Sequence, residues 1–310
     1  MSVSSRDVPL AWLPDLLACP RCGRPLEPRG DLLACDEGHT YPTRPHLDLL
    51  APGKRPANEG PGDTADMVRR RAAWERRLQG EVGSGERVAL ERYLDTIAPW
   101  LRPDAVVLDL GCGTGDALRR LGARYPGPLR LIGLDISTPM LDAAYRTLRR
   151  EPRAVVARAS GRRRLPLRDG VVDIVLRRLA PALLDEALRA LKPGGVYVTA
   201  SFGPARWREL YDALPELPRP KGVREPAVDA LMAQGFAAAE SHTWRGSETA
   251  TPAEALDRLL MGPAAFHVDQ ERDLPRLQAL ASPHGMLRLT TDAEVVVGIK
   301  GEGDRRHTLV

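Results

Sequence analysis

Apolar segments and helix-periodic segments alternate along the middle of the chain. Short apolar runs suited to buried strands occupy residues 105–108, 129–134, 154–159, 171–176 and 196–201. Segments with apolar residues on one helical face accompany them, at residues 67–101 (with a break at 80–85), 115–121, 138–149 and 182–191. Strands that alternate with helices in this way predict an α/β fold with a mostly parallel sheet and helices on its faces.

The C-terminal third is less regular. The pattern predicts a strand over residues 237–244 and helices over 204–213, 226–234, 253–260 and 274–281. Residues 286–300 are expected to be extended, with a turn at Thr291 and Asp292. A strand pair of this kind is expected to complete the sheet in antiparallel fashion at its edge.

The stretch VVLDLGCGTGDALRRL places a glycine turn between a predicted strand and a predicted helix. Glycines at alternate positions permit positive φ and close approach of a ligand, and they stand at Gly111, Gly113 and Gly115. The free amides at the start of the helix favour a polar ligand. A dinucleotide fingerprint would require a further glycine at Asp116, so this turn is of a different type. The next strand ends in Asp135, twenty residues after Gly115, where a carboxylate can bind both hydroxyls of a ribose.

Three of the four cysteines lie close together near the N-terminus. Cys19-x2-Cys22 and Cys35-x3-His39 are separated by twelve residues, and together they offer the four sulfur and nitrogen ligands that tetrahedral zinc prefers. Because all four positions would be filled by the protein, the sequence predicts a structural zinc ribbon and not a catalytic metal. Residues 32–34 read as a strand between the two ligand pairs, and residues 1–18 as a loosely structured lead-in.

These segments suggest three parts. Residues 1–50 would form the zinc-ribbon domain, the Pro- and Gly-rich residues 51–66 a linker, and residues 67–310 the α/β domain. The chain of 310 residues carries a formal net charge of +4, which mildly favours an anionic partner such as RNA. No apolar run approaches membrane-spanning length and no secretory leader is evident, so a cytoplasmic location is expected.

The combination of DLGCGTG and GLDIS resembles the class I S-adenosylmethionine-dependent methyltransferases. The chain resembles the bacterial zinc-ribbon ribosomal RNA (guanine-N1)-methyltransferases, a family that includes a tylosin-resistance enzyme. The resemblance lies in the order of its features, which are the ribbon, GDTADMVRRR, the two motifs above, RLPLRDGVVDIVLRRLAP and LKPGGVYVTASFGP. This resemblance implies a Rossmann-like, mostly parallel seven-stranded sheet, S-adenosylmethionine as cofactor, large-subunit ribosomal RNA as substrate, and a homodimer. It also implies that the ribbon recognises RNA and that its zinc ligands are Cys19, Cys22, Cys35 and His39.

The same resemblance assigns the cofactor site. Asp109, Gly111, Gly113 and Asp135 carry over as cofactor contacts. Residues beside them or on the turns after neighbouring strands extend the expected set to Cys112, Ile136, Ser160 and Arg177.

Two segments depart from the family pattern, and both are expected beside the acceptor. Where the family has Gly-His-Tyr, this chain has Leu78-Gln79-Gly80-Glu81-Val82. Where the family has Ile-Tyr-(Ala/Ser)-Pro-Cys after the fourth strand, residues 178–182 read RLAPA. The acceptor therefore stays open between ribosomal RNA and a small biosynthetic molecule. A non-catalytic cofactor-binding protein that uses its ribbon for contacts is a third hypothesis, against which the intact glycine turn argues.

The sequence does not identify a catalytic base. His242, His267 and His284 are histidines of the C-terminal region without a distinguishing context. Trp74, Trp244 and Phe266 are the aromatic side chains considered for stacking on an extruded base. Trp74 lies in RRRAAWERR, in which five arginines accompany a single glutamate. This segment fits an RNA-facing surface or an ordinary solvated helix face.

Overall fold

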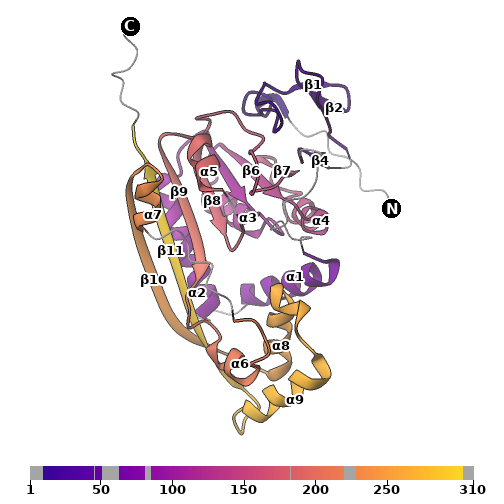
Figure 1. Ribbon diagram of the computed structural model, residues 1–310, viewed down its shortest axis with the longest axis vertical. Coiled ribbons are helices and arrows are strands. Elements are labelled where there is room, and N and C mark those ends of the chain that lie inside the picture. The colour runs from indigo at the N-terminus through magenta and orange to yellow at the C-terminus, as the bar shows by residue number, and fades with distance from the viewer. Residues whose placement is uncertain are drawn as a thin grey trace.

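A computed structural model describes residues 10–44, 46–50, 63–80, 85–181, 183–219 and 228–302. Its centre is a mixed sheet with the strand order β10-β11-β9-β8-β5-β6-β7-β4 (Figure 1). All neighbouring strands are parallel except β11, which runs antiparallel to both β9 and β10. The strands are β4 (Leu47–Asp48), β5 (Ala105–Leu110), β6 (Leu129–Asp135), β7 (Ala154–Arg158), β8 (Val172–Arg178), β9 (Leu191–Phe202), β10 (Phe236–Ala250) and β11 (Leu287–Lys300).

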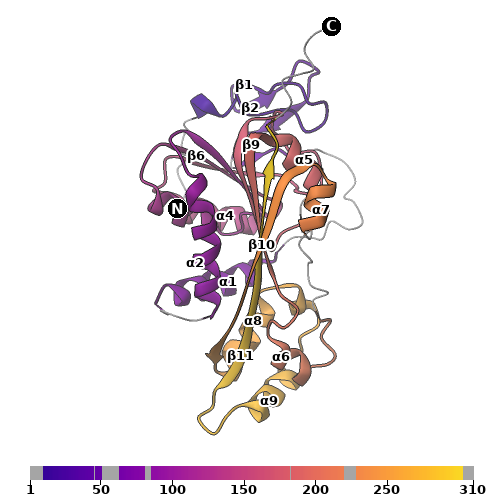
Figure 2. The ribbon, with the colours of Figure 1, turned by 90° about the vertical axis from the view of Figure 1, so that its left-hand side faces the viewer.

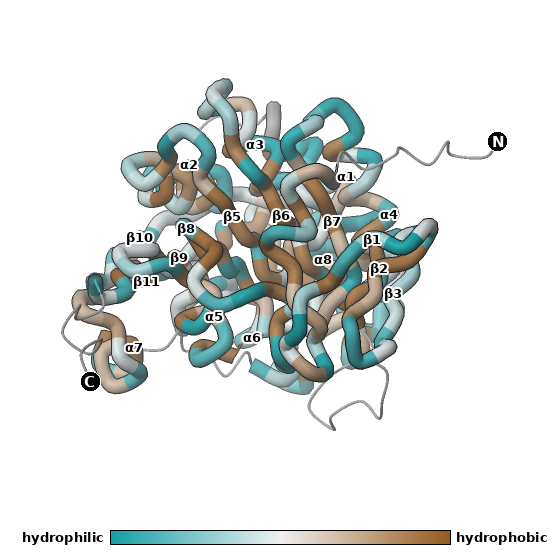
Figure 3. Tube along the Cα trace, turned by 90° about the horizontal axis from the view of Figure 1, so that it is seen from above, coloured by the Kyte–Doolittle hydropathy of each residue, from teal (hydrophilic) through white to brown (hydrophobic). Residues whose placement is uncertain are grey.

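Helices cover one face of this sheet. Apolar side chains of α2 (Gly85–Ile97), α3 (Asp116–Arg124) and α4 (Thr138–Thr147) pack on β5, β6 and β9 around Leu94, Leu118 and Leu141. Seen from above, the apolar trace of β5 and β6 lies beside α2 and α3 (Figure 3). Strand β5 is buried along its whole length, as its continuous apolar run predicts.

The other face is covered partly by the N-terminal segment. Helices α5 (Leu184–Ala190) and α7 (Val228–Ala233) pack there, together with Leu17, Leu26 and Leu33 of the N-terminal segment. That segment begins with a 3-10 turn, Leu10–Trp12, and contains a small antiparallel sheet of β1 (Glu27–Arg29), β2 (Leu32–Ala34) and β3 (Thr40–Pro42). The part of the predicted lead-in that the structure describes is not loose, because Leu13, Leu16 and Leu17 are buried in the shared core; residues 1–9 lie outside the described residues.

A second group of helices lies at the opposite end of the molecule from the ribbon. The long strands β10 and β11 extend out of the main sheet and pack on these helices, which share the buried Trp207, Leu256 and Leu277 (Figure 2). The helices are α6 (Arg208–Ala213), α8 (Pro252–Leu260), α9 (Gln270–Leu280) and the 3-10 turn Pro263–Phe266.

Helix α1 (Ala65–Gly80) lies between this group and the glycine turn (Figure 1). Ion pairs of Arg70 with Asp257 and of Arg77 with Glu254 hold it against α8. The remaining element is a 3-10 turn, Ala98–Trp100, after α2. Helix α1 ends at Gly80 and α2 begins at Gly85, and residues 81–84, where the break is expected, lie outside the described residues. Among the described helices, none has the length and apolar character needed to span a membrane.

The predicted strands and the class of fold are confirmed, with three differences. The sheet has eight strands instead of seven, since the two-residue β4 from the end of the ribbon segment pairs with β7. Strand β9 begins already at Leu191, so the Lys-Pro-Gly-Gly stretch lies within the strand. Strand β11 is continuous, and the turn expected at Thr291 and Asp292 is wrong. Both side chains are buried, and Asp292 accepts a hydrogen bond from the Ala205 amide at 3.0 Å, which satisfies it without a turn.

Candidate functional site

The glycine turn lies at the point where the strand order of the sheet reverses, between β5 and β8. Gly111, Gly113 and Gly115 have φ values of 75°, 53° and 78°, all in the left-handed region that side chains disfavour. A Cβ on Gly111 would lie 2.2 Å from the Cβ of Ala180, so the loop after β8 closes directly over the turn. In open α/β sheets this crevice at the carboxyl ends of the strands is where ligands bind.

Asp135, at the end of β6, faces the glycine turn. Its carboxylate accepts hydrogen bonds from the Gly113 amide at 2.9 Å and from the Ser137 amide at 2.8 Å. Burial raises the pKa of this carboxyl, and the two amide donors oppose that rise. Ile136 follows directly, and its carbonyl accepts from Arg158 at 3.3 Å. Ser160 ends the turn after β7, where its hydroxyl accepts from the Arg162 amide at 3.2 Å.

Asp109 and Cys112 are the buried members of the predicted set. Burial raises the pKa of Asp109 to about 7, although the positive charge of Arg178 lowers it. Burial also raises the pKa of the Cys112 thiol well above its usual value. The Cys112 side chain packs in the apolar core beside Gly133, so only its backbone is available to line the turn.

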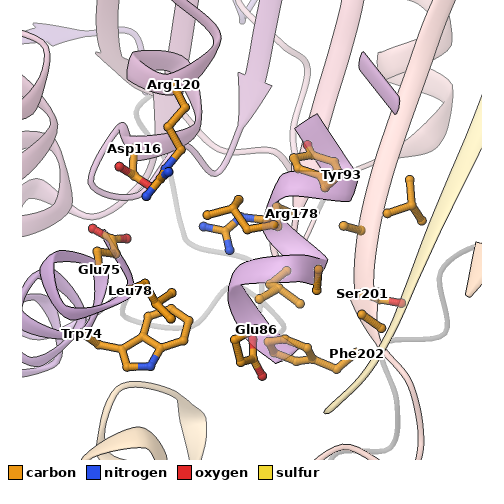
Figure 4. A pocket seen from close by; sticks show the side chains of 16 residues that line it. Trp74, Glu75, Leu78, Glu86, Tyr93, Asp116, Arg120, Arg178, Ser201 and Phe202 are labelled. Atoms are coloured by element: carbon orange, nitrogen blue, oxygen red, sulfur yellow. The ribbon is translucent and has the colours of Figure 1, made fainter. Parts of the chain in front are cut away.

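A cavity opens next to this turn, between α1, α2 and the carboxyl ends of β8 and β9 (Figure 4). It contains about 550 Å³ of space not filled by atoms, part of it open to solvent. Its apolar walls include Trp74, Leu78, Tyr93 and Phe202, and its charged groups are Glu75, Glu86, Asp116, Arg120 and Arg178.

Glu75 of α1 is connected to the glycine turn. The Thr114 hydroxyl lies 2.9 and 2.7 Å from the two carboxylate oxygens of Glu75. Burial raises the pKa of Glu75 and the charge of Asp116 adds to this, whereas the Thr114 hydroxyl, Arg178 and Arg71 lower it. A carboxylate with a raised pKa in a cleft is a common property of groups that accept protons in catalysis.

Arg178 is the cation of the cavity without a fixed partner. Its guanidinium forms no hydrogen bond with the residues that the structure describes, and Figure 4 shows it directed toward Glu75 and Asp116. Apart from Glu75, the other charged groups that line the cavity are in ion pairs. Asp116 accepts from Arg120 at 2.6 Å, and Glu86 accepts from Arg206 at 2.8 Å.

Only some of the residues singled out from the sequence line this cavity. Arg177 points away from the cavity, since its guanidinium is buried against Thr199 and the carbonyl of Ala180. None of the three histidines considered as a base lines the cavity, and of the aromatic candidates only Trp74 does. Sequence reasoning missed Glu75 and Thr114, and it named Arg178 only as part of the segment expected beside the acceptor. The available signal was that Glu75 is the single acid in RRRAAWERR.

Both segments that depart from the family pattern reach this cavity. Leu78 comes from the first, and Arg178 and Leu179 come from the second. Residues 81, 82 and 182 lie outside the described residues. The structure thus brings together two sequence differences that are about a hundred residues apart.

The four predicted metal ligands also come together. The ligand atoms of Cys19, Cys22, Cys35 and His39 all lie within 4.8 Å of one another. Sγ of Cys22 is 3.7 Å from Sγ of Cys35, and Nδ1 of His39 is 3.5 Å from Sγ of Cys19 and of Cys35. A tetrahedron with zinc–sulfur bonds of about 2.3 Å has edges of about 3.8 Å, so this donor set fits a zinc ion.

The ribbon is attached firmly to the α/β domain. Arg168 donates to the carbonyls of Leu17 and Pro14, both at 3.1 Å. His46 Nε2 donates to the Asp142 carboxylate of α4 at 2.7 Å, and its ring stacks on Tyr145 with ring centroids 4.7 Å apart. The two parts therefore share one core rather than being joined only through the linker.

Comparisons with known proteins agree with this geometry. A family model described as a methyltransferase domain matches residues 107–195. A crystal structure of a candidate methyltransferase from Bacillus halodurans has the same fold, with a TM-score of 0.51 at 16% identity over 68% of this chain and 98% of that one. The fold, the glycine turn and the acidic strand end define a class I S-adenosylmethionine-dependent methyltransferase.

Two relatives identify the family within this class of methyltransferases. The 23S rRNA (guanine(748)-N(1))-methyltransferase of Streptomyces fradiae is 34% identical over 275 residues, which cover 86% of this chain and 92% of that enzyme. A candidate 23S rRNA (guanine-N(1)-)-methyltransferase of Micromonospora griseorubida is 32% identical over 87% of this chain and 94% of its own length. The chain belongs to the family of these proteins, the zinc-ribbon 23S rRNA (guanine-N1)-methyltransferases.

Proposed function

We propose that the protein methylates N1 of a guanine in 23S ribosomal RNA. The observation that carries this proposal is the relationship to the Streptomyces fradiae enzyme over nearly the whole of both chains, ribbon included. The exposed arginines of the ribbon and of the neighbouring turn suit contact with RNA phosphates, and they include Arg21, Arg29 and Arg164.

In this proposal the crevice beside the glycine turn holds the cofactor. The Asp135 carboxylate is placed to accept hydrogen bonds from the ribose hydroxyls in exchange for those from Gly113 and Ser137. The turn formed by Gly111, Cys112 and Gly113 approaches without side-chain obstruction, and Ile136 and Ser160 border the crevice on the side of β6 and β7. Asp109 supports the turn from within the sheet. Arg177 supports the loop that covers the crevice through its bond to the carbonyl of Ala180.

When bound, S-adenosylmethionine supplies an electrophilic methyl group on a sulfonium, so the protein's contribution is alignment and exclusion of water. The cavity next to the glycine turn provides the space for the acceptor. The zinc ribbon would have a structural role, because four protein ligands leave no coordination position for a substrate.

A labelling experiment tests this function. The purified protein is incubated with methyl-labelled S-adenosylmethionine and either 23S rRNA transcribed in vitro or an extract of small molecules. We expect label in the RNA, and mass spectrometry of its nucleosides should identify 1-methylguanosine. Label confined to the small-molecule extract would replace the RNA by a small biosynthetic acceptor, and absence of cofactor binding in calorimetry would indicate a non-catalytic protein.

Two further expectations belong to the same proposal. The substrate places the protein in the cytoplasm, where ribosomes are assembled. The homodimer expected from the family is tested by sedimentation of the full chain, for which a species of twice the 33.9 kDa chain mass is the expected result.

A further inference from the structure

The charged groups of the cavity beside the glycine turn match the hydrogen-bonding groups of one nucleobase. Its charged groups that are not neutralised by a neighbouring ion pair are the Glu75 carboxylate and the Arg178 guanidinium. Both act on the same region, since the positive charge of Arg178 lowers the pKa of Glu75 as well as that of Asp109. The structure therefore presents an acceptor and a donor of opposite charge on one side of the cavity (Figure 4).

The walls of the cavity suit a flat ring. The Trp74 indole lines it from α1, and Phe202 and Tyr93 line it from β9 and α2. The Trp74 Nε1 atom is buried without a hydrogen-bond partner among the described residues. Aromatic walls of this kind stabilise extruded bases by stacking.

Resting on the proposed function, we infer that this cavity is the guanine acceptor site, in which Glu75 receives the N1 proton and Arg178 stabilises the charge that develops on O6. A carboxylate can accept from both the N1–H and the N2 amino group of guanine. Arg is the residue most often found on guanine O6 and N7. Adenine has a lone pair at N1, which would face the Glu75 carboxylate, and an amino group at position 6, which would face the Arg178 guanidinium. Glu75 would then meet an acceptor and Arg178 a donor, so neither could form a hydrogen bond.

The transfer then balances in one step. The N1 proton moves to a carboxylate oxygen of Glu75, and the electron pair left on N1 forms the new bond to the methyl carbon. The carbon–sulfur bond of the sulfonium breaks with its pair on sulfur, so the products are 1-methylguanine, S-adenosylhomocysteine and protonated Glu75. The positive charge of Arg178 opposes the negative charge on O6 while N1 is deprotonated.

The surroundings of Glu75 suit proton transfer. Groups from three elements face it: Arg71 of its own helix, Thr114 and Asp116 at the start of α3, and Arg178 of β8. Burial and Asp116 favour the protonated form, and the Thr114 hydroxyl holds the carboxylate toward the cavity. The carboxylate is thus oriented and has an increased affinity for a proton.

The variant Glu75→Gln tests the role of Glu75, because it keeps the shape and the hydrogen bond to Thr114 but cannot take the proton. We expect kcat on transcribed 23S rRNA to fall by about 10²–10⁴-fold at pH 7, with unchanged affinity for S-adenosylmethionine in calorimetry. The rate of the variant should rise about tenfold per pH unit above pH 7, because hydroxide then removes the N1 proton, whereas the wild-type rate should reach a plateau. Glu240→Gln is the control, since that side chain is 66% exposed on β10.

A second comparison tests the contact with the base itself. The methylated guanine, once located by mass spectrometry, is replaced by inosine, which lacks the N2 amino group. Wild type should lose about tenfold in kcat/KM on inosine, and Glu75→Ala should show no such difference between the two bases. The variant Arg178→Met should lose more activity than Arg178→Lys, which retains the charge.

The outcomes separate the two proposals. Failure of the wild-type protein to form 1-methylguanosine would overturn the function itself. Formation of 1-methylguanosine by Glu75→Gln at the wild-type rate, or with the wild-type pH profile, would overturn the role of Glu75 alone. Equal inosine penalties in wild type and Glu75→Ala would exclude the contact with N2.

Discussion

Asp135 at the end of β6 is joined to Gly113 of the glycine turn by a hydrogen bond of 2.9 Å from the backbone amide to Oδ2. This bond links two segments that the sequence places 22 residues apart, and it fixes the carboxylate at the mouth of the crevice. The same oxygen atoms are the ones proposed to receive the ribose hydroxyls.

The variant Asp135→Asn should therefore bind the cofactor more weakly. An amide replaces a charged acceptor, and hydrogen bonds to charged groups contribute about 1.5–3 kcal/mol. We expect the dissociation constant for S-adenosylhomocysteine, measured by calorimetry, to rise about 10–100-fold. Asp95→Asn serves as the control because that side chain is 68% exposed on α2. Unchanged affinity in Asp135→Asn would remove this carboxylate from the cofactor site.

The variant Gly111→Ala should also impair the crevice, and Gly194→Ala provides a matched control. Both glycines have positive φ, 75° and 71°, so alanine introduces a backbone cost of about 1–2 kcal/mol at either position. Only at Gly111 would the new Cβ also clash, at 2.2 Å from Ala180, whereas nothing lies within 4 Å of Gly194. Chemical denaturation should show a loss of that size in Gly194→Ala and a larger one in Gly111→Ala, and calorimetry should show lost cofactor binding in Gly111→Ala alone. Equal binding by the two variants would contradict the close approach of the loop.

Stability should depend on the protonation of Asp109. The pKa of this buried carboxyl is raised to about 7, whereas in the unfolded chain it is about 4. Between these values the native state holds a proton that the unfolded state has released, so the free energy of unfolding falls as pH rises from about 4 to about 7. In Asp109→Asn this contribution is absent. The stability of the variant relative to wild type should increase by about 2–4 kcal/mol between pH 4.5 and pH 8 in urea denaturation. A difference that does not vary with pH would show that Asp109 is ionised in the native protein.

Zinc should be required by the whole chain and not only by the ribbon. Cys19 and Cys35 are buried in the same core cluster as Leu165 and Leu167 of the α/β domain. We expect about one zinc per chain by mass spectrometry of metals, lost in Cys22→Ser and retained in Cys112→Ala. Loss of the metal should lower the melting temperature of the main cooperative transition. A ribbon that melts separately, with the main transition unchanged, would contradict the shared core.

The buried ion pair of Arg258 and Glu248 should be more important for stability than a surface pair of similar length. Both side chains are 2% exposed and their charged atoms lie 2.8 Å apart. Replacing Glu248 by Ala leaves the Arg258 charge buried and unpaired, at a cost of about 3–5 kcal/mol in urea denaturation. The surface pair of Arg276 and Glu216 has a distance of 2.7 Å with both side chains 42% exposed, so Glu216→Ala should cause no measurable change. Equal effects of the two substitutions would refute the distinction.

The sequence by itself determined the features that depend on short segments. The apolar run of residues 105–108 predicted a buried strand, and the glycines that follow it predicted a turn with positive φ. The spacing of Cys19, Cys22, Cys35 and His39 likewise fixed the metal cluster, because two short loops suffice to bring four ligands together. The acid at Asp135 and the order of strands and helices identified the class of fold.

Tertiary structure alone decided which distant residues face one cavity. Glu75, Thr114 and Arg178 come from α1, the glycine turn and β8, and no local pattern relates their positions. The sequence could not distinguish Arg177 from Arg178 either, since neighbouring residues of a strand point to opposite faces and the register depends on pairing with β5 and β9. Nor could it show that β11 runs straight through Thr291 and Asp292, because the Asp292 carboxylate meets its partner, the Ala205 amide, only in the folded protein.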